Sequence, residues 1–235
     1  MNNTIKQPIR ARFRSKIARK YYWDLGRDES DTILVAGAGR SGTTWLAELL
    51  NSENKFRMMF EPFSKNNPNA QGLLHSRQYI GRTCYNSVFY NVVKDILSGS
   101  TRGKWVDRYN RRFVVKRRIA KAIHANLMLG WIQYNFPKVP IVFIMRHPCA
   151  VALSRVQCGW DSQGAINDLL SQSDLMKDHL SPFRDTIRYA KSPFEQHMIV
   201  WAVENALPLR EMTKGNFHLV KYEDLVTRPQ QSLDE

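Results

Sequence analysis

The sequence predicts an α/β fold in which a parallel sheet is flanked by helices, and two observations support this. From about Asp31 onward, short apolar runs alternate with longer segments of helical periodicity. One run, at 140–145, reads Pro-Ile-Val-Phe-Ile-Met, which is typical of a strand buried on both faces of a parallel sheet. Such alternation favours right-handed crossovers, with ligands bound at the carboxyl ends of the strands.

The first half of the chain contains two predicted strands and the helix between them. Residues 33–36 form an apolar run that ends in a glycine-rich turn, and residues 43–50 carry an apolar face at helical spacing. Residues 56–60 are a second apolar run, which a Glu-Pro pair ends. Residues 66–100 have Asn, Gly and Ser at their edges, so we expect loops and one helix that cover a site.

The second half of the chain continues the alternation. We expect a short strand at 113–116, a helix at 120–136 and the buried strand at 140–145. Pro148 then lies where a helix would begin, because proline is favoured in the first turn. The last two predicted elements are a helix at 193–212 and a strand at 217–221.

Length and composition indicate an ordinary globular chain. Its 235 residues, 43% of them hydrophobic, are enough to bury the core of one domain. The cysteines, Cys84, Cys149 and Cys158, form no CxxC pair, so we expect neither a disulfide framework nor a structural zinc site, and a cytoplasmic location. The apolar runs are far shorter than the roughly 20 residues that a membrane span needs.

The formal net charge of +14 is unevenly distributed. Residues 1–23 hold seven Lys or Arg and no acid, with Ile or Phe at every fourth position. We therefore expect residues 1–30 to be a basic arm that docks on the main domain, 31–235, or touches an anionic membrane surface. A second basic cluster, 102–121, is opposed only by Asp107. It is either a solvated face or a field that attracts an anionic ligand.

The turn after the first strand carries the strongest functional signal. It reads Gly37-Ala38-Gly39-Arg40-Ser41-Gly42-Thr43-Thr44 and opens a helix, so backbone N–H groups and the helix dipole converge there. The glycines permit positive φ values, and the hydroxyl groups add donors. The sequence therefore predicts a phosphate site at this turn.

Two familiar phosphate patterns overlap in this turn. Gly37-x-Gly39-x-x-Gly42 fits the dinucleotide fingerprint, and Glu61 falls about 20 residues further on, where a ribose-binding acid would lie. An NAD(P)-dependent oxidoreductase is therefore one alternative. The turn also nearly fits the nucleoside triphosphate loop, but Thr43 occupies the lysine position. Arg40 instead brings a cation into the loop, which suits a phosphosulfate.

Two segments resemble those of sulfotransferases that use 3′-phosphoadenosine-5′-phosphosulfate (PAPS). Arg40-Ser41-Gly42-Thr43-Thr44-Trp45 resembles the 5′-phosphosulfate loop, and Arg146-His147-Pro148 with Ser154 resembles the 3′-phosphate site. An arginine at a strand end and a hydroxyl about two helical turns later can reach the same phosphate. The resemblance implies a P-loop-like three-layer sandwich, PAPS as donor and no metal. Trp45 would stack on the adenine or pack in the core.

The resemblance also implies catalytic residues. Residues 114–118 resemble a strand that reads Lys-Thr-His in cytosolic members, so Lys116 matches the lysine that stabilises the sulfuryl group and Arg118 replaces the histidine. Phe60-Glu61-Pro62 resembles carbohydrate-type and bacterial members, where this glutamate is the general base. Glu61 would thus be the base, and Arg40 and Lys116 would stabilise the transferred group. We expect His124 in the following helix to be structural.

The acceptor, the completeness of the chain and the class of function stay open. The acceptor would be a hydroxyl or amine of a small molecule, a glycan or a lipid, and we expect no nucleic-acid partner. Tyr222-Glu223-Asp224-Leu225 resembles a late motif after which family members continue, so we expect a chain truncated at its C-terminus. Besides a sulfotransferase and an oxidoreductase, a basic domain that binds polyanions without catalysis remains possible.

Overall fold

The computed structural model describes residues 17–18, 20–26, 28–70 and 72–234. Residues 1–16, which hold most of the predicted basic arm, lie outside the described residues, as does its proposed membrane contact. Among the described residues, no helix is long and apolar enough to span a membrane.

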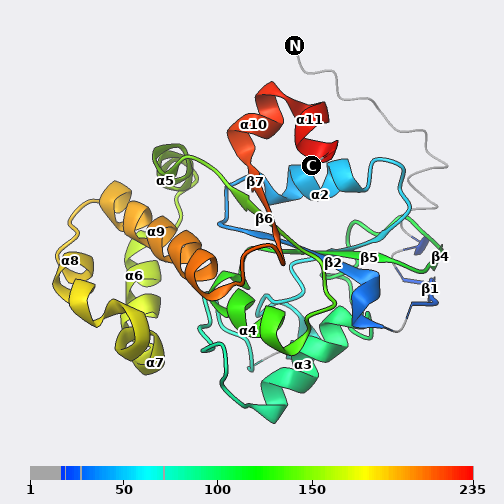
Figure 1. The fold of residues 1–235 in the computed structure, drawn as a ribbon, viewed down its shortest axis with the longest axis horizontal. Coiled ribbons are helices and arrows are strands. Elements are labelled where there is room, and N and C mark those ends of the chain that lie inside the picture. The colour runs from blue at the N-terminus through cyan, green and yellow to red at the C-terminus, as the bar shows by residue number, and fades with distance from the viewer. Residues whose placement is uncertain (1–16, 19, 27, 71, 235) are drawn as a thin grey trace.

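A five-stranded, wholly parallel sheet forms the centre of the molecule (Figure 1), with strand order β3-β5-β2-β6-β7. Opposite Ala36 of β2 lie Ala122 of β5 and Phe143 of β6, so these strands reach the same edge together. The carboxyl ends of the strands therefore form one ligand-binding edge. The strands are β2 (Thr32–Gly37), β3 (Arg57–Phe60), β5 (Arg118–Ala122), β6 (Ile141–Met145) and β7 (His218–Lys221).

Helices cover both faces of this sheet, and a third group of helices lies beside it (Figure 1). One face carries α2 (Thr43–Leu50), α10 (Tyr222–Thr227) and α11 (Pro229–Asp234). The other carries α3 (Ser87–Leu97) and α4 (Leu129–Asn135). The lateral group comprises α5 (Pro148–Gln157), α6 (Ser162–Leu170), α7 (Ser173–Leu175), α8 (Arg184–Arg188) and α9 (Pro193–Glu211). This arrangement confirms the predicted three-layer α/β sandwich.

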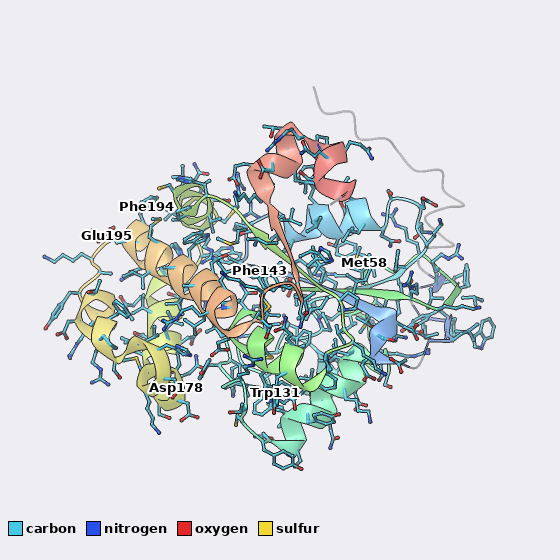
Figure 2. The ribbon with its side chains drawn as sticks, in the orientation of Figure 1. Met58, Trp131, Phe143, Asp178, Phe194 and Glu195 are labelled. Carbon is cyan, nitrogen blue, oxygen red and sulfur yellow. The ribbon has the colours of Figure 1, made fainter. Side chains whose placement is uncertain are left out.

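The alternation of side chains along β2 divides the core between the two faces. Leu34 packs in one cluster with Phe143 and with Trp131 of α4 (Figure 2). Val35 packs in a separate cluster on the α2 side, which includes Met58. Successive residues of a strand point to opposite faces, and each face of this strand is covered, so a continuously apolar run is required.

Between residues 113 and 136, the predicted strand is present but lies outside the central sheet, and the predicted helix begins later than expected. The strand β4 covers only Val114–Val115 and pairs with β1 (Trp23–Asp24) outside the central sheet. The central strand is β5, where the sequence predicted the start of a helix, and the helical region is limited to η3 (Asn126–Met128) and α4. Ala120 and Ala122 favour a helix, but burial between β3 and β2 overrides that weak preference.

Lys116 does not lie at the predicted site, because the central strand is β5 and Lys116 precedes it. Lys116 is exposed and precedes β5, at the amino-terminal edge of the sheet. The glycine-rich turn lies at the carboxyl-terminal edge, because it follows β2 and the two strands are parallel. Lys116 is therefore not positioned to contact a group bound in that turn.

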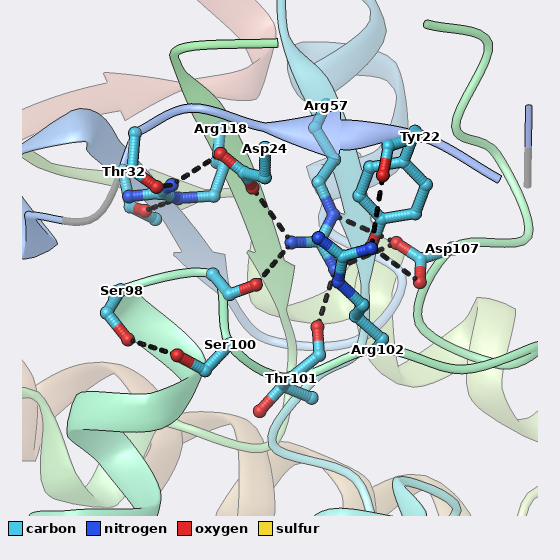
Figure 3. A network of polar contacts seen from close by, with 12 residues as sticks. Tyr22, Asp24, Thr32, Arg57, Ser98, Ser100, Thr101, Arg102, Asp107 and Arg118 are labelled. Atoms are coloured by element: carbon cyan, nitrogen blue, oxygen red, sulfur yellow. Dashed lines mark hydrogen bonds and ion pairs between the residues drawn. The ribbon is translucent and has the colours of Figure 1, made fainter. Parts of the chain in front are cut away.

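A buried network of ion pairs occupies the amino-terminal edge (Figure 3). Asp24 accepts hydrogen bonds from Arg57 at 3.0 Å and from Arg118 at 2.9 Å. Arg57 also pairs with Asp107 at 2.9 Å, and Tyr22 donates to the same carboxylate at 3.0 Å. Arg118, which was matched to a catalytic histidine, is thus a structural residue far from the turn. Tyr22 and Asp24 pack within the domain, although the sequence assigned them to the arm.

Candidate functional site

The turn between β2 and α2 forms a backbone wrap that suits an anion. Arg40 and Gly42 have φ values of 76° and 93°, and between them the Ser41 N–H donates to the Ala38 carbonyl at 3.0 Å. No side chain caps the N-terminus of α2, so the N–H groups of its first turn stay available. Left-handed residues followed by a helix N-terminus create a concave array of N–H donors.

The Ser41 hydroxyl is an orphan donor within this wrap. Its side chain is fully buried, and its Oγ has no hydrogen-bond partner among the residues that the structure describes. Burying a hydroxyl without a partner costs about 1–3 kcal/mol, so such groups are rare and call for an explanation. Because this Oγ is inaccessible and Ser41 does not line the cavity beside the loop, the hydroxyl does not contact a ligand held there in this conformation.

Aromatic rings pack so closely on the loop that two of its positions require glycine. A Cβ at Gly39 would lie 2.6 Å from the Trp160 ring, and one at Gly42 would lie 2.7 Å from the Tyr222 ring. Gly42 also has a positive φ, which few other residues adopt without strain. The glycines thus serve both the wrap and the contact with these rings.

The two predicted phosphate-binding segments meet in the structure. Arg146 follows β6 and Ser154 lies in α5, as predicted. Arg40 Nε donates to Ser154 Oγ at 2.9 Å, and Arg146 Nη1 donates to the Arg40 carbonyl at 3.2 Å. Residues more than 100 positions apart in the sequence therefore form one cationic cluster.

Tyr222 links this cluster to Trp45. The Arg146 guanidinium lies 4.3 Å from the centroid of the Tyr222 ring, and the Trp45 ring packs edge-on against it at 5.7 Å between centroids. Trp45 is half-buried, so it both packs on the domain and presents part of its ring to the space beside the loop. Two aromatic rings, inclined at 66° to each other, therefore border the cationic cluster, and a ring of this kind can stack on a base.

A cavity of about 360 Å³ lies between the loop, the cluster and the rings. Its lining includes every predicted cofactor-binding residue except Ser41 and Ser154, and its size is at the lower end of the range for ligand sites. Sequence reasoning missed four further residues that line it: Lys121, Ile123, Trp160 and Tyr222. Of these, Lys121 was hidden by the wrong helix prediction.

Glu61 and Lys121 form a buried pair next to this cavity. Glu61 directly follows β3 and has a φ of 45°, a conformation uncommon for a residue with a side chain. Its carboxylate accepts a hydrogen bond from Lys121 Nζ through Oε1 and one from the Ile123 N–H, at 3.0 Å, through Oε2. Lys121 also lines the cavity. The structure thus brings Lys121, instead of Lys116, to the carboxyl-terminal edge beside Glu61.

His124 is a second group near the pair that can accept a proton. It follows β5 in a loop, so the predicted helical setting is wrong. Burial lowers the pKa of His124, and the negative charge of Glu61 offsets this in part. The imidazole is therefore neutral near pH 7.

A buried network supports the loop from below. Arg155 of α5 donates to the Gly39 carbonyl through Nε at 3.2 Å and Nη2 at 3.1 Å, and Nη2 also reaches Glu204 of α9 at 2.6 Å. Arg77 donates to the other oxygen of Glu204 at 2.9 Å. Burial alone would raise the pKa of Glu204, but the two guanidinium groups hold it below its usual range. This network was not predicted from the sequence.

Comparison with known proteins identifies the family of the chain. A family model described as the sulfotransferase family matches residues 32–235. The chain therefore belongs to the sulfotransferase family. None of the curated proteins matches it.

Solved structures similar to the chain include three sulfotransferases. A sulfotransferase domain from the curacin biosynthetic pathway is 18% identical, with a TM-score of 0.48 over 86% of this chain and 70% of that one. The sulfotransferase domain of the Synechococcus PCC 7002 olefin synthase is 17% identical, with a TM-score of 0.45 over 91% and 74%. A sulfotransferase from Alicyclobacillus acidocaldarius is 14% identical, with a TM-score of 0.43 over 85% and 76%.

Proposed function

We propose that this sulfotransferase takes the sulfuryl group from PAPS and places it on a hydroxyl or amine of its acceptor. The hydrogen bond between Arg40 and Ser154 carries the proposal, because it joins the loop to the segment of Arg146, and both Arg40 and Arg146 line one cavity. A nucleotide with phosphates at both its 5′ and 3′ positions needs two phosphate-binding segments that are no further apart than its own length. A nucleotide with a 5′-phosphate alone needs only the loop.

The lining of the cavity supports one orientation of the donor. The 5′-phosphosulfate would lie in the loop, where the N–H groups and the Thr43 and Thr44 hydroxyls donate to it. The 3′-phosphate would accept from Arg146 and Ser154, by charge-assisted bonds. The adenine would then lie against Trp45 and Tyr222.

The Glu61–Lys121 pair supplies the groups that the transfer requires. The acceptor oxygen or nitrogen attacks sulfur, the bond between sulfur and the 5′-phosphate oxygen breaks, and the acceptor proton passes to the Glu61 carboxylate. Negative charge builds on the leaving oxygen, and the cations Arg40 and Lys121 stabilise it. A positioned base contributes about 10²–10⁴-fold to such a step.

Membership of the sulfotransferase family argues against the oxidoreductase alternative, and the contacts of Glu61 argue against it as well. In that alternative Glu61 would bind a ribose, whereas here its carboxylate pairs with Lys121, a cation that lines the nucleotide cavity.

A thermal-shift series with 3′-phosphoadenosine-5′-phosphate (PAP), AMP and NAD, all in EDTA, tests the proposal. PAP at 100 times its dissociation constant should stabilise the protein by about 2.7 kcal/mol, and AMP should do much less because it lacks the 3′-phosphate. Stabilisation by NAD without stabilisation by PAP contradicts the proposal. Binding of PAP without consumption of PAPS in the presence of any acceptor would favour a polyanion-binding domain that lacks catalysis.

A further inference from the structure

A second cavity, of about 310 Å³, adjoins the proposed nucleotide cavity. The two cavities share Thr44 and Lys121 in their linings, one from the start of α2 and one from the end of β5. A group that extends from the second cavity toward these two residues approaches the place where the sulfuryl group would lie. The second cavity is therefore placed where an acceptor is needed.

Two unpaired charges of opposite sign distinguish this cavity. Glu48 on α2 and Arg111 on the loop before β4 both line it, and both are exposed. Neither side chain has a hydrogen bond or an ion pair within the part of the chain that the structure describes. By contrast, Lys121 is paired with Glu61. A ligand that displaces water from this cavity therefore meets one carboxylate and one guanidinium.

The pair of charges selects among classes of acceptor. A carboxylate only accepts hydrogen bonds and a guanidinium only donates them, whereas a hydroxyl can do both. An anionic acceptor would suit Arg111 but repel Glu48, and a cationic one would suit Glu48 but repel Arg111. An apolar chain would strip water from both charges without replacing it. Among uncharged compounds, one with several hydroxyl groups serves both charges at once.

Aromatic side chains complete the lining. Phe60 and Tyr109 pack edge to face at 5.0 Å between ring centroids, and Tyr109 is 42% exposed. Lys121 and Arg108 lie over the Phe60 ring, at 4.7 Å and 5.1 Å from its centroid, so Tyr109 supplies the exposed ring. Its apolar surface beside the polar groups matches a sugar ring with its apolar C–H face and its hydroxyl edge.

We propose that this cavity binds the acceptor, and that the acceptor presents a neutral saccharide residue. The inference rests on the proposed function, because the sulfuryl donor must occupy the adjoining cavity. One hydroxyl of the sugar passes between Thr44 and Lys121 to the sulfur atom, loses its proton to Glu61 and becomes the sulfate ester. Glu48 and Arg111 hold other hydroxyl groups of the same residue.

Binding to the PAP-saturated protein tests the inference without turnover. The neutral probes are the methyl glycosides of glucose, galactose and mannose, and the competing probes are glucuronate, glucosamine and 1-octanol. Saturation-transfer NMR with titration should give the tightest binding for a neutral glycoside. Tighter binding of the anion, the amine or the alcohol overturns the inference, and so does the absence of binding by all three glycosides. Failure of PAP itself to bind overturns the proposed function first, which separates the two failures.

Matched variants assign the binding to this cavity. Glu48→Gln and Arg111→Ala should each weaken the glycoside about tenfold, the effect of losing a charged hydrogen-bond partner. PAP affinity should not change, because neither residue lines the nucleotide cavity. The controls are Glu53→Gln and Arg112→Ala, both exposed and absent from the lining, and they should change neither affinity. Unchanged glycoside binding in both Glu48→Gln and Arg111→Ala would show that the sugar binds elsewhere.

Discussion

Arg155 and Glu204 form a fully buried ion pair, 2.6 Å between Nη2 and Oε2, directly beneath the proposed nucleotide loop. The same guanidinium donates to the Gly39 carbonyl, so the ion pair and the loop share one group. Since Arg77 holds the other oxygen of Glu204, the carboxylate fixes two arginines from separate parts of the chain. The pair positions the loop and does not itself line the cavity.

The first prediction concerns the loss of this carboxylate. Glu204→Gln keeps the shape but leaves Arg155 without its counter-charge, and removing one partner of a buried pair costs about 3–5 kcal/mol. Urea denaturation should show this loss at pH 7. Isothermal titration should show weaker PAP binding, because the Gly39 carbonyl loses a fixed donor. Lower stability with unchanged PAP affinity would limit the pair to a structural role.

The pH dependence of the same variant gives a second readout. The pKa of Glu204 is lower in the folded state than its ordinary value of 4.5. The stabilisation by its charge is therefore fully present above about pH 4.5 and is lost as pH falls through the lower, folded pKa. The difference in stability between wild type and Glu204→Gln should shrink in that acidic range. A difference that stays constant down to the acid transition contradicts the assignment.

The second prediction separates the 3′-phosphate from the loop. Arg146→Ala should weaken PAP by about 1.5–3 kcal/mol, the contribution of a charge-assisted hydrogen bond, and should leave the weaker binding of AMP nearly unchanged. Isothermal titration with both nucleotides measures the difference. The control is Arg184→Ala, an exposed residue on α8 outside the cavity lining. Equal weakening of PAP and AMP would mean that Arg146 acts through its contacts with the Arg40 carbonyl and Tyr222.

The third prediction compares the two lysines that could stabilise the transferred group. Lys121→Ala should lower kcat by about 10²-fold or more, because it removes a cation beside the reacting group. Lys116→Ala should leave kcat unchanged, since Lys116 is exposed at the opposite edge of the sheet. Initial rates of PAP formation at saturating PAPS give both values. Loss of activity in Lys116→Ala with retention in Lys121→Ala would restore the assignment made from the sequence.

The sequence predicted a site residue where the neighbouring residues in the chain define its role, and failed where only the fold does. The loop after β2 and the Arg146 segment were predictable, because each follows an apolar strand directly and its spacing is visible in a few residues. Lys121 was not, because two alanines around it favour a helix and only the neighbouring strands make that segment a strand. The ion pair between Arg155 and Glu204 was not predictable either, because the two residues are 49 positions apart in the sequence. The acceptor cavity likewise joins α2 to the loop before β4 through the fold alone.

The last prediction identifies the general base. Glu61 and His124 are both candidates: Glu61 pairs with Lys121, which lines the nucleotide cavity, and His124 is held neutral by burial. Glu61→Gln removes the proton acceptor and keeps the size of the side chain. We expect it to bind PAP about as well as wild type and to lose about 10²-fold or more in kcat. His124→Gln should retain near-normal turnover.

The pH profile separates the two bases when either variant also loses stability. If His124 were the base, kcat would fall below its pKa, which lies under 6.5, and Glu61→Gln would keep that limb of the profile. If Glu61 is the base, His124→Gln keeps the wild-type profile. A melting-temperature shift by PAP in each variant verifies that the nucleotide cavity is intact. Normal turnover in Glu61→Gln with loss of turnover in His124→Gln would move the base to the loop after β5, where the imidazole takes the proton of the acceptor instead.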